Sequence, residues 1–280
     1  MNTLKKILLF MLIGCFVAGS LTFILWYNLR TAKLSVEYAS VEGGLVLRKY
    51  NGASSDTRLV IPDTAADGSG DERPVVALEE FSLSNALYLE ELCVGANVRD
   101  IHPWAVTNCQ ALRSIEADPD NPYFTSVDGV LYSRDMTRLV LCPNMNSERF
   151  AIPESVTAIA ENAFYKCKNL LEVTFPPGLR EIAERAFFRC AGLETLNLPA
   201  NLEVIGPDAF AFCDGLQGDI AIPASCRMVG DYAFSSKDSK ISKITILADE
   251  GAIALGRDWL PLREKKAGAK VEYEFAGGAR

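Results

Sequence analysis

Cysteine is the residue type in this sequence best suited to chemistry, and four of its eight cysteines occupy one position of a repeated motif: Cys109, Cys167, Cys190 and Cys213. Cysteine thiolates bind zinc and form disulfides, so the spacing decides between these roles and a structural one. No two cysteines have the C-x-x-C spacing of a zinc knuckle. Residues at one position of a repeat stack in a row, where a buried cysteine acts as a small hydrophobic residue. We expect that structural role, while the geometry also allows a disulfide between neighbouring coils.

The sequence offers little else for catalysis. Its one histidine, His102, precedes Pro103 and is expected in a turn. No H-E-x-x-H, G-x-S-x-G or P-loop motif is present. Asp118 and Asp120 could bind calcium, but Pro122 takes the next ligand position and no glutamate follows at EF-hand spacing, so a turn network is expected there. We therefore predict no enzyme activity, no metal site and no cofactor.

The cysteines belong to a motif that recurs every 23 residues, at 163–167 (AFYKC), 186–190 (AFFRC) and 209–213 (AFAFC). Each copy has a leucine three residues after the cysteine and an isoleucine four residues before the alanine. A fixed period in the twenties indicates a solenoid, because one such unit is too small to bury a core and must stack on its neighbours. The extended surface of a solenoid favours binding over catalysis.

One complete unit, residues 193–215 (LETLNLPANLEVIGPDAFAFCDG), predicts how each coil is built. Its first leucines fit a short strand, which Pro199 ends because proline cannot donate to a ladder. The segment from Ile205 to Phe210 has apolar residues at helical spacing. We therefore predict an α/β-type solenoid. It is a leucine-rich-repeat horseshoe with a parallel concave β-sheet and short helical or 3-10 turns on the convex side.

Leu112 and Leu170 occupy the same repeat position but are 58 residues apart. One repeat accounts for 23 of these residues, so an insertion of 35 residues separates the two repeats. It contains Asp128-Gly129 between β-forming residues, a strong hairpin signal since both turn positions favour positive φ. A further strand is expected at Leu139–Leu141. Residues 119–150 are thus predicted to form an ordered β-hairpin insertion.

These units resemble the BspA-like class of bacterial leucine-rich repeats. The resemblance rests on residues 152–159 (IPESVTAI), on Ala163-Phe164 with Cys167, and on the insertion motif at 121–132 (NPYFTSVDGVLY). It covers roughly residues 40–250. The resemblance implies a cell-surface protein that acts in adhesion and protein binding.

Residues 7–27 form a run of 21 residues without a charge, between Lys5-Lys6 and Arg30. About 20 apolar residues span the hydrocarbon core as a helix, and Trp26-Tyr27 fit an aromatic belt. We predict an uncleaved transmembrane signal anchor with the following residues outside the cytoplasm, at the cell surface or in the periplasm. Two alternatives stay open: a lipoprotein modified at Cys15, or cleavage followed by secretion.

The predicted organisation has four parts. Residues 1–30 form the anchor, 31–75 a β cap, 76–248 the leucine-rich repeats with the hairpin insertion, and 249–280 a C-terminal cap. The net charge is −8, although the first 30 residues contribute three positive charges and no negative one. The rest of the chain is therefore strongly acidic, which excludes nucleic acid as a partner and leaves residues 7–27 as the only membrane contact.

We predict a partner-binding strip at the outward positions of the concave strands. Its acidic, hydroxyl, amide and thiol side chains are Glu91, Cys93, Ser114, Glu116, Glu172, Thr174, Thr195 and Asn197. Neighbouring coils lie about 4.8 Å apart, so the strip is expected to be contiguous. The expected partner is another protein or a surface glycan. The alternative function is that of a non-adhesive structural or envelope-assembly component.

Overall fold

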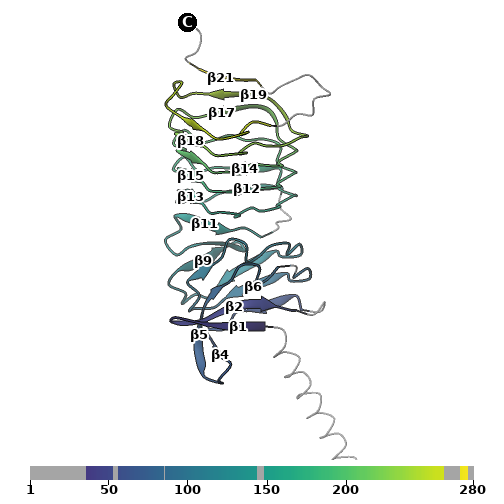
Figure 1. Cartoon of the computed structure of the whole chain (residues 1–280), viewed down its shortest axis with the longest axis vertical. Helices are drawn as coiled ribbons and strands as arrows, with labels where there is room; N and C mark the ends of the chain where they lie inside the picture. Colours follow the sequence, from purple (N-terminus) through teal and green to yellow (C-terminus); the bar gives the residue numbers. More distant parts are fainter. Residues whose placement is uncertain (1–35, 53–55, 85, 144–147, 262–271, 277–280) are drawn as a thin grey trace, which may run out of the picture.

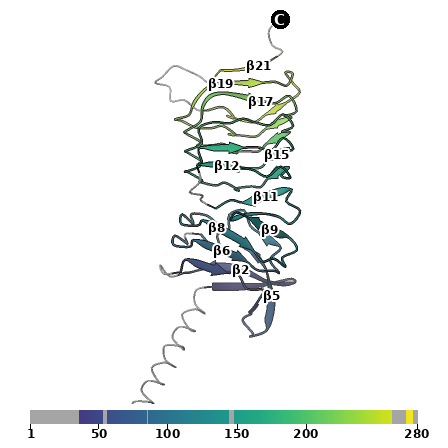
Figure 2. The same cartoon turned by 180° about the vertical axis from the view of Figure 1, so that it is seen from behind.

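The computed structural model describes residues 36–52, 56–84, 86–143, 148–261 and 272–276. Over these residues the chain winds into a β-solenoid of about seven turns, whose coils stack along one axis (Figures 1 and 2). The apolar run at 7–27 lies outside the described residues. Within them, no helix has the length and apolar character needed to cross a membrane.

Strands from the Leu-x-Leu segments form one face of the solenoid, here called the LxL face. It contains three short parallel sheets, because the pairing is interrupted twice along the stack. These sheets consist of β3 (Arg58–Val60), β6 (Glu91–Val94) and β8 (Ser114–Ala117); β12 (Arg149–Ala151) and β14 (Glu172–Thr174); and β17 (Gln217–Ile222), β19 (Lys240–Ile246) and β21 (Glu272–Phe275).

A second face, here called the Ile face, is one eight-stranded sheet in the order β20-β18-β16-β15-β13-β11-β10-β9. Its repeat strands have two residues each and pair in parallel, so that Ile159, Ile182 and Ile205 lie in one row. The strands are β9 (Phe124–Val127), β10 (Val130–Ser133), β11 (Arg138–Leu141), β13 (Ala158–Ile159), β15 (Glu181–Ile182), β16 (Val204–Ile205), β18 (Met228–Val229) and β20 (Ala254–Leu255).

The expected helical or 3-10 turns are not found in the described residues, and this part of the predicted fold was wrong. Each A-F-x-x-C segment is a tight turn instead, with positive φ at Lys166 (61°), Arg189 (61°) and Phe212 (57°). A residue in the left-handed conformation cannot continue a right-handed helix. The backbone therefore forms hydrogen bonds to the next coil. The N–H of Phe164, for example, donates to the carbonyl of Ala186 at 2.7 Å. We call this series of bonds between coils the turn ladder.

The N-terminal coils are closed by a separate sheet. Strands β1 (Val36–Val41) and β2 (Gly44–Tyr50) form an antiparallel hairpin, and β2 pairs in parallel with β5 (Glu72–Leu78). Strand β5 also pairs with β4 (Thr64–Ala66) and β7 (Asp100–Ile101). This sheet therefore covers the end of the stack on the N-terminal side (Figure 1).

The hairpin insertion is confirmed. Strands β9 and β10 pair antiparallel around Asp128 and Gly129, whose φ angles of 52° and 76° are those of the expected turn. Strand β11 then pairs in parallel with β13 and returns the chain to the solenoid.

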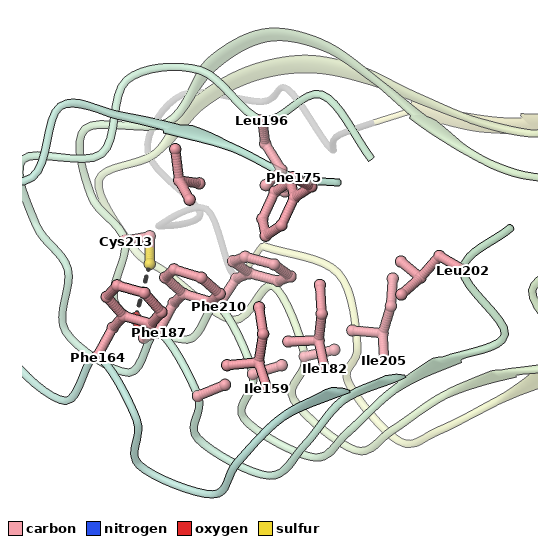
Figure 3. Packing of buried hydrophobic residues seen from close by; sticks show 14 of the residues in the cluster. Ile159, Phe164, Phe175, Ile182, Phe187, Leu196, Leu202, Ile205, Phe210 and Cys213 are labelled. Carbon is pink, nitrogen blue, oxygen red and sulfur yellow. Dashed lines mark hydrogen bonds between the residues drawn. The ribbon is translucent and has the colours of Figure 1, made fainter. Parts of the chain in front are cut away.

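The buried residues form two clusters that meet at this insertion, one from Leu45 to Leu131 and one from Val130 to Trp259. In the larger cluster the phenylalanines of successive coils stack, with ring centroids 4.6 Å apart for Phe164 and Phe187 and 5.2 Å for Phe187 and Phe210. Figure 3 shows these rings between the isoleucine row and the side chains of Phe175 and Leu196. One aromatic residue per repeat thus gives a continuous core.

Candidate binding site

The predicted strip lies on the surface of the LxL face. In the parallel register of β6 and β8, Glu91 is paired with Ser114 and Cys93 with Glu116. Further along the face are the other four residues, Glu172 and Thr174 on β14 and Thr195 and Asn197 in the segment that follows. All eight side chains are exposed or half-buried.

The hairpin insertion interrupts the strip after β8. The N–H of Ile115 donates to the carbonyl of Gly129 at 2.9 Å, and the N–H of Ala117 donates to Ser126 Oγ at 3.1 Å. Strand β8 therefore borders the hairpin and does not pair with β12. The structure brings the first four strip residues together and places the last four in a second group.

All three strip carboxylates have partners. Arg58 Nε lies 3.1 Å from Glu91, and Arg149 Nε lies 3.4 Å from Glu172. Glu116 accepts hydrogen bonds from Ser114 Oγ at 2.6 Å and from Ser126 Oγ at 2.9 Å. The strip is therefore a mixed surface of arginine, carboxylate and hydroxyl groups, suited to a partner that also presents both donors and acceptors.

The cysteine row lies inside the solenoid, and no disulfide joins the seven described cysteines to one another. Cys190 Sγ donates to the carbonyl of Phe164 at 3.0 Å, and Cys213 Sγ donates to that of Phe187 at 3.1 Å (Figure 3). Burial raises the pKa of Cys109 to about 11 and also raises the pKa of Cys213. These thiols stay protonated at neutral pH, which makes them weak nucleophiles and poor metal ligands.

The other candidate residues lie in turns. His102 Nδ1 accepts the N–H of Trp104 at 3.2 Å. The Asp118 carboxylate accepts the N–H of Asp120 at 2.8 Å, which is the expected turn network. Cys93 is half-buried, with Arg58 Nη2 3.5 Å from its sulfur. Among the residues that the structure describes, no three potential ligands are gathered closely enough to hold a metal.

A row of aromatic residues along the turns, here called the turn edge, was not predicted from the sequence. The Tyr165 ring lies 5.3 Å from that of Trp104 and 5.7 Å from that of Phe188, and Phe188 lies 5.2 Å from Phe212. The Arg189 guanidinium lies 5.5 and 5.3 Å from the last two rings. The signal was present in the AFYKC and AFFRC motifs, where a second aromatic residue and a basic residue follow the core phenylalanine.

A pocket of about 200 Å³, here called the junction pocket, opens beside the turn edge. It lies where side chains replace the turn ladder between two coils: Asn162 Nδ2 donates to the carbonyl of Pro103 at 3.4 Å, and Lys166 Nζ donates to Asn108 Oδ1 at 2.5 Å. The carbonyl of Ala163 accepts the N–H of Cys142 instead of that of a repeat turn. The lining residues are Pro103, Val106, Thr107, Asn108, Cys109, Gln110, Leu112, Leu141, Cys142, Pro143, Asn162, Tyr165, Lys166 and Lys168.

Comparison with protein families gives one match. Residues 140–254 match the BspA-type leucine-rich repeat region in six copies. No curated protein matches the chain.

Several solved structures are similar to this one. A leucine-rich repeat protein from Eubacterium ventriosum is 18% identical with a TM-score of 0.47, over 67% of this chain and 52% of the other. A leucine-rich cell surface protein from Faecalibacterium prausnitzii is 17% identical with a TM-score of 0.42, over 82% and 75%. A leucine-rich repeat protein from Bacteroides ovatus is 17% identical with a TM-score of 0.40, over 86% and 75%. The chain spans about half the length of the Eubacterium protein.

Proposed function

We propose that this protein, whose repeats belong to the BspA-type leucine-rich repeat family, binds another protein through its LxL face and catalyses no reaction. The chain is a leucine-rich repeat protein of the type found at bacterial surfaces, and such solenoids generally act by binding. In this proposal the apolar residues 7–27 anchor it, and the solenoid acts outside the cytoplasm in adhesion or protein binding.

One observation carries the proposal: the outward side chains of β6 and β8 stand in defined register on neighbouring strands whose inward side chains are buried in the core. Glu91, Cys93, Ser114 and Glu116 occupy two neighbouring rows, and the arginine and serine bonds described above hold two of their carboxylates in place. Polar groups that are held in position before binding lose less entropy when a partner docks. A standard interface covers about 800 Å² on each partner, so the partner must extend beyond these rows along the face.

Protease treatment of intact cells tests the placement. The full chain carries a C-terminal tag, and a cytoplasmic protein with the same tag serves as the control. Rapid loss of the tag from the solenoid, with the control intact, supports an outward-facing protein. Full protection contradicts adhesion and favours the alternative of a structural or envelope-assembly component, which predicts envelope defects on deletion.

Charge reversal tests the surface. A partner recovered by cross-linking on the cell is purified, and its dissociation constant is measured with the full chain and with Glu91→Arg and Glu116→Arg. Loss of a buried hydrogen-bonded charge at an interface weakens binding by about 2 kcal/mol or more, or roughly 30-fold. Glu181→Arg, exposed on β15 of the Ile face, is the matched control. Unchanged affinity in the two strip variants would assign the partner to another surface.

A further inference from the structure

We propose that the junction pocket binds an acidic sugar, that is, one carboxylated or sulfated unit of a glycan chain. The pocket is separate from the strip on the LxL face, so a negative result for one of the two sites does not contradict the other.

The charge of the pocket selects an anion. Two lysines, Lys166 and Lys168, line it, and no aspartate or glutamate is among its lining residues. Neither lysine lies within ion-pair distance of a carboxylate in the described part of the chain. Arg189 does not line the pocket but adds a positive charge further along the turn edge, where its guanidinium lies against the rings of Phe188 and Phe212. A basic pocket on a chain of net charge −8 concentrates anionic ligands locally.

The pocket also has a polar group in need of a partner. Asn162 is 1% exposed, and its Oδ1 makes no hydrogen bond within the described residues. Its Nδ2 donates to the carbonyl of Pro103 at 3.4 Å and to Glu161 Oε1 at 3.5 Å, which orients the amide with its Oδ1 acceptor left over. A buried acceptor without a donor costs free energy, and a ligand that supplies a donor recovers it. A sugar hydroxyl is such a donor.

The remaining lining fits a sugar ring. Thr107, Gln110 and Asn108 present hydroxyl and amide groups that can both donate and accept, as sugar hydroxyls do. Tyr165 also lines the pocket and adds a phenolic hydroxyl, which can both donate and accept. A volume of about 200 Å³ is below the roughly 300–1,000 Å³ of sites for drug-sized ligands, which matches a single ring-sized unit.

An acidic peptide is the competing occupant. It would satisfy the two lysines and could donate a backbone N–H to Asn162 Oδ1, but it offers only one such donor per residue, whereas a sugar ring carries several hydroxyl groups that both donate and accept. The combination of cations, an unpaired acceptor and several lining hydroxyl and amide groups therefore favours an acidic sugar.

The test measures binding of defined oligosaccharides to the full chain, purified in mild detergent, by isothermal titration. The probe is a hyaluronan hexasaccharide, in which every second unit carries a carboxylate. The neutral control is a chitin hexasaccharide, and a glutamate hexapeptide represents the acidic peptide. Hyaluronan is expected to bind at least about tenfold more tightly than either control. Its affinity is expected to fall with added salt.

Two variants test the site and a third is a charge control. Lys168→Glu changes an exposed side chain and is expected to weaken hyaluronan binding about tenfold or more. Asn162→Gly removes the side-chain amide, and glycine tolerates the φ of 57° at this position. This variant is also expected to weaken hyaluronan binding about tenfold or more. Lys240→Glu, exposed at the start of β19, is the matched charge control and should leave the affinity unchanged.

The proposal is overturned if hyaluronan does not bind, if chitin binds equally well, or if Lys168→Glu binds like the unmodified chain. Preferential binding of the glutamate peptide would overturn it in favour of an acidic protein partner. Circular dichroism and thermal unfolding establish that each variant is folded. Because Lys168 is exposed on a turn, its variant keeps the test decisive even if Asn162→Gly destabilises the fold.

Discussion

The phenyl ring of Phe164 stacks on that of Phe187, with 4.6 Å between the centroids and 9° between the planes. The same residue position continues the stack through Phe210 and Phe234, at 5.2 and 5.4 Å. The stability of a solenoid is approximately a sum of terms for single repeats and for the interfaces between neighbours. A ring inside the stack therefore contributes to two interfaces at once.

Replacing Phe187 by alanine is expected to lower the free energy of unfolding by about 3–5 kcal/mol, because it leaves a cavity between two rings. Phe212→Ala is the matched control, since this ring is 38% exposed at the turn edge, and its loss should cost about 1 kcal/mol or less. Urea denaturation of the two variants measures both. Equal losses would mean that the stack does not determine stability.

The hairpin turn makes a second prediction. Gly129 has a φ of 76°, and a Cβ there would lie 3.0 Å from Ser114 Oγ and 3.2 Å from Ser114 Cα. Gly129→Ala is therefore expected to cost about 1–3 kcal/mol through backbone strain and the displacement of the hairpin from β8. Gly70→Ala is the control, because Gly70 has a φ of 94° but an added Cβ would meet open space. The difference between the two melting temperatures isolates the contact with β8, and identical shifts would show that this contact is unimportant.

The solenoid itself was predictable, because leucine, isoleucine and phenylalanine recur at fixed positions and each marks an inward-facing site. The hairpin was predictable for the same reason, since Asp128-Gly129 specifies its turn locally. The form of the A-F-x-x-C turn was not. Its positive φ falls on Lys166, Arg189 and Phe212, which are not the residues that signal a left-handed conformation. The turn is stabilised by bonds to the next coil, which a single repeat does not reveal.

The candidate sites depended even more on contacts between coils. The strip is interrupted because Gly129 accepts the bond from Ile115 that a repeat strand would otherwise receive, and spacing alone does not show where an insertion docks. The junction pocket arises from the same interruption on the turn edge. The aromatic row, in contrast, was predictable from Tyr165 and Phe188. Each directly follows the core phenylalanine of its repeat, and the two are 23 residues apart.

The turn at Asn121 makes a third prediction. Asn121 is 0% exposed, its Nδ2 donates to the carbonyls of Gly95 and Val98, and its Oδ1 accepts the N–H groups of Tyr123 and Phe124. Asn121→Ala should lower the free energy of unfolding by about 3 kcal/mol or more, because each buried backbone group left without a partner costs about 1–3 kcal/mol. The control lies in the same region: Asn97→Ala removes one exposed bond, to the carbonyl of Asp63, and should cost about 1 kcal/mol or less. Chemical denaturation compares them, and a small loss in both would mean that water replaces the Asn121 bonds.

The buried thiols make a prediction about pH. Burial raises the pKa of Cys109 from 9.0 to about 11, and it also raises the pKa of Cys213. A raised pKa in the folded state means that the unfolded chain loses its proton first. The stabilising contribution is therefore fully present below pH 9 and is lost as the pH rises from 9 towards the folded value. Each such thiol should reduce the free energy of unfolding by about 1.4 kcal/mol per pH unit in that range.

Urea denaturation between pH 8 and pH 10.5 with a reductant present measures this slope. Cys213→Ala should lower the stability at every pH through its cavity, but it should also make the slope shallower by the share of one thiol. Parallel curves for the variant and the unmodified chain would show that Cys213 does not titrate on unfolding, and that its burial has no part in the loss of stability at high pH.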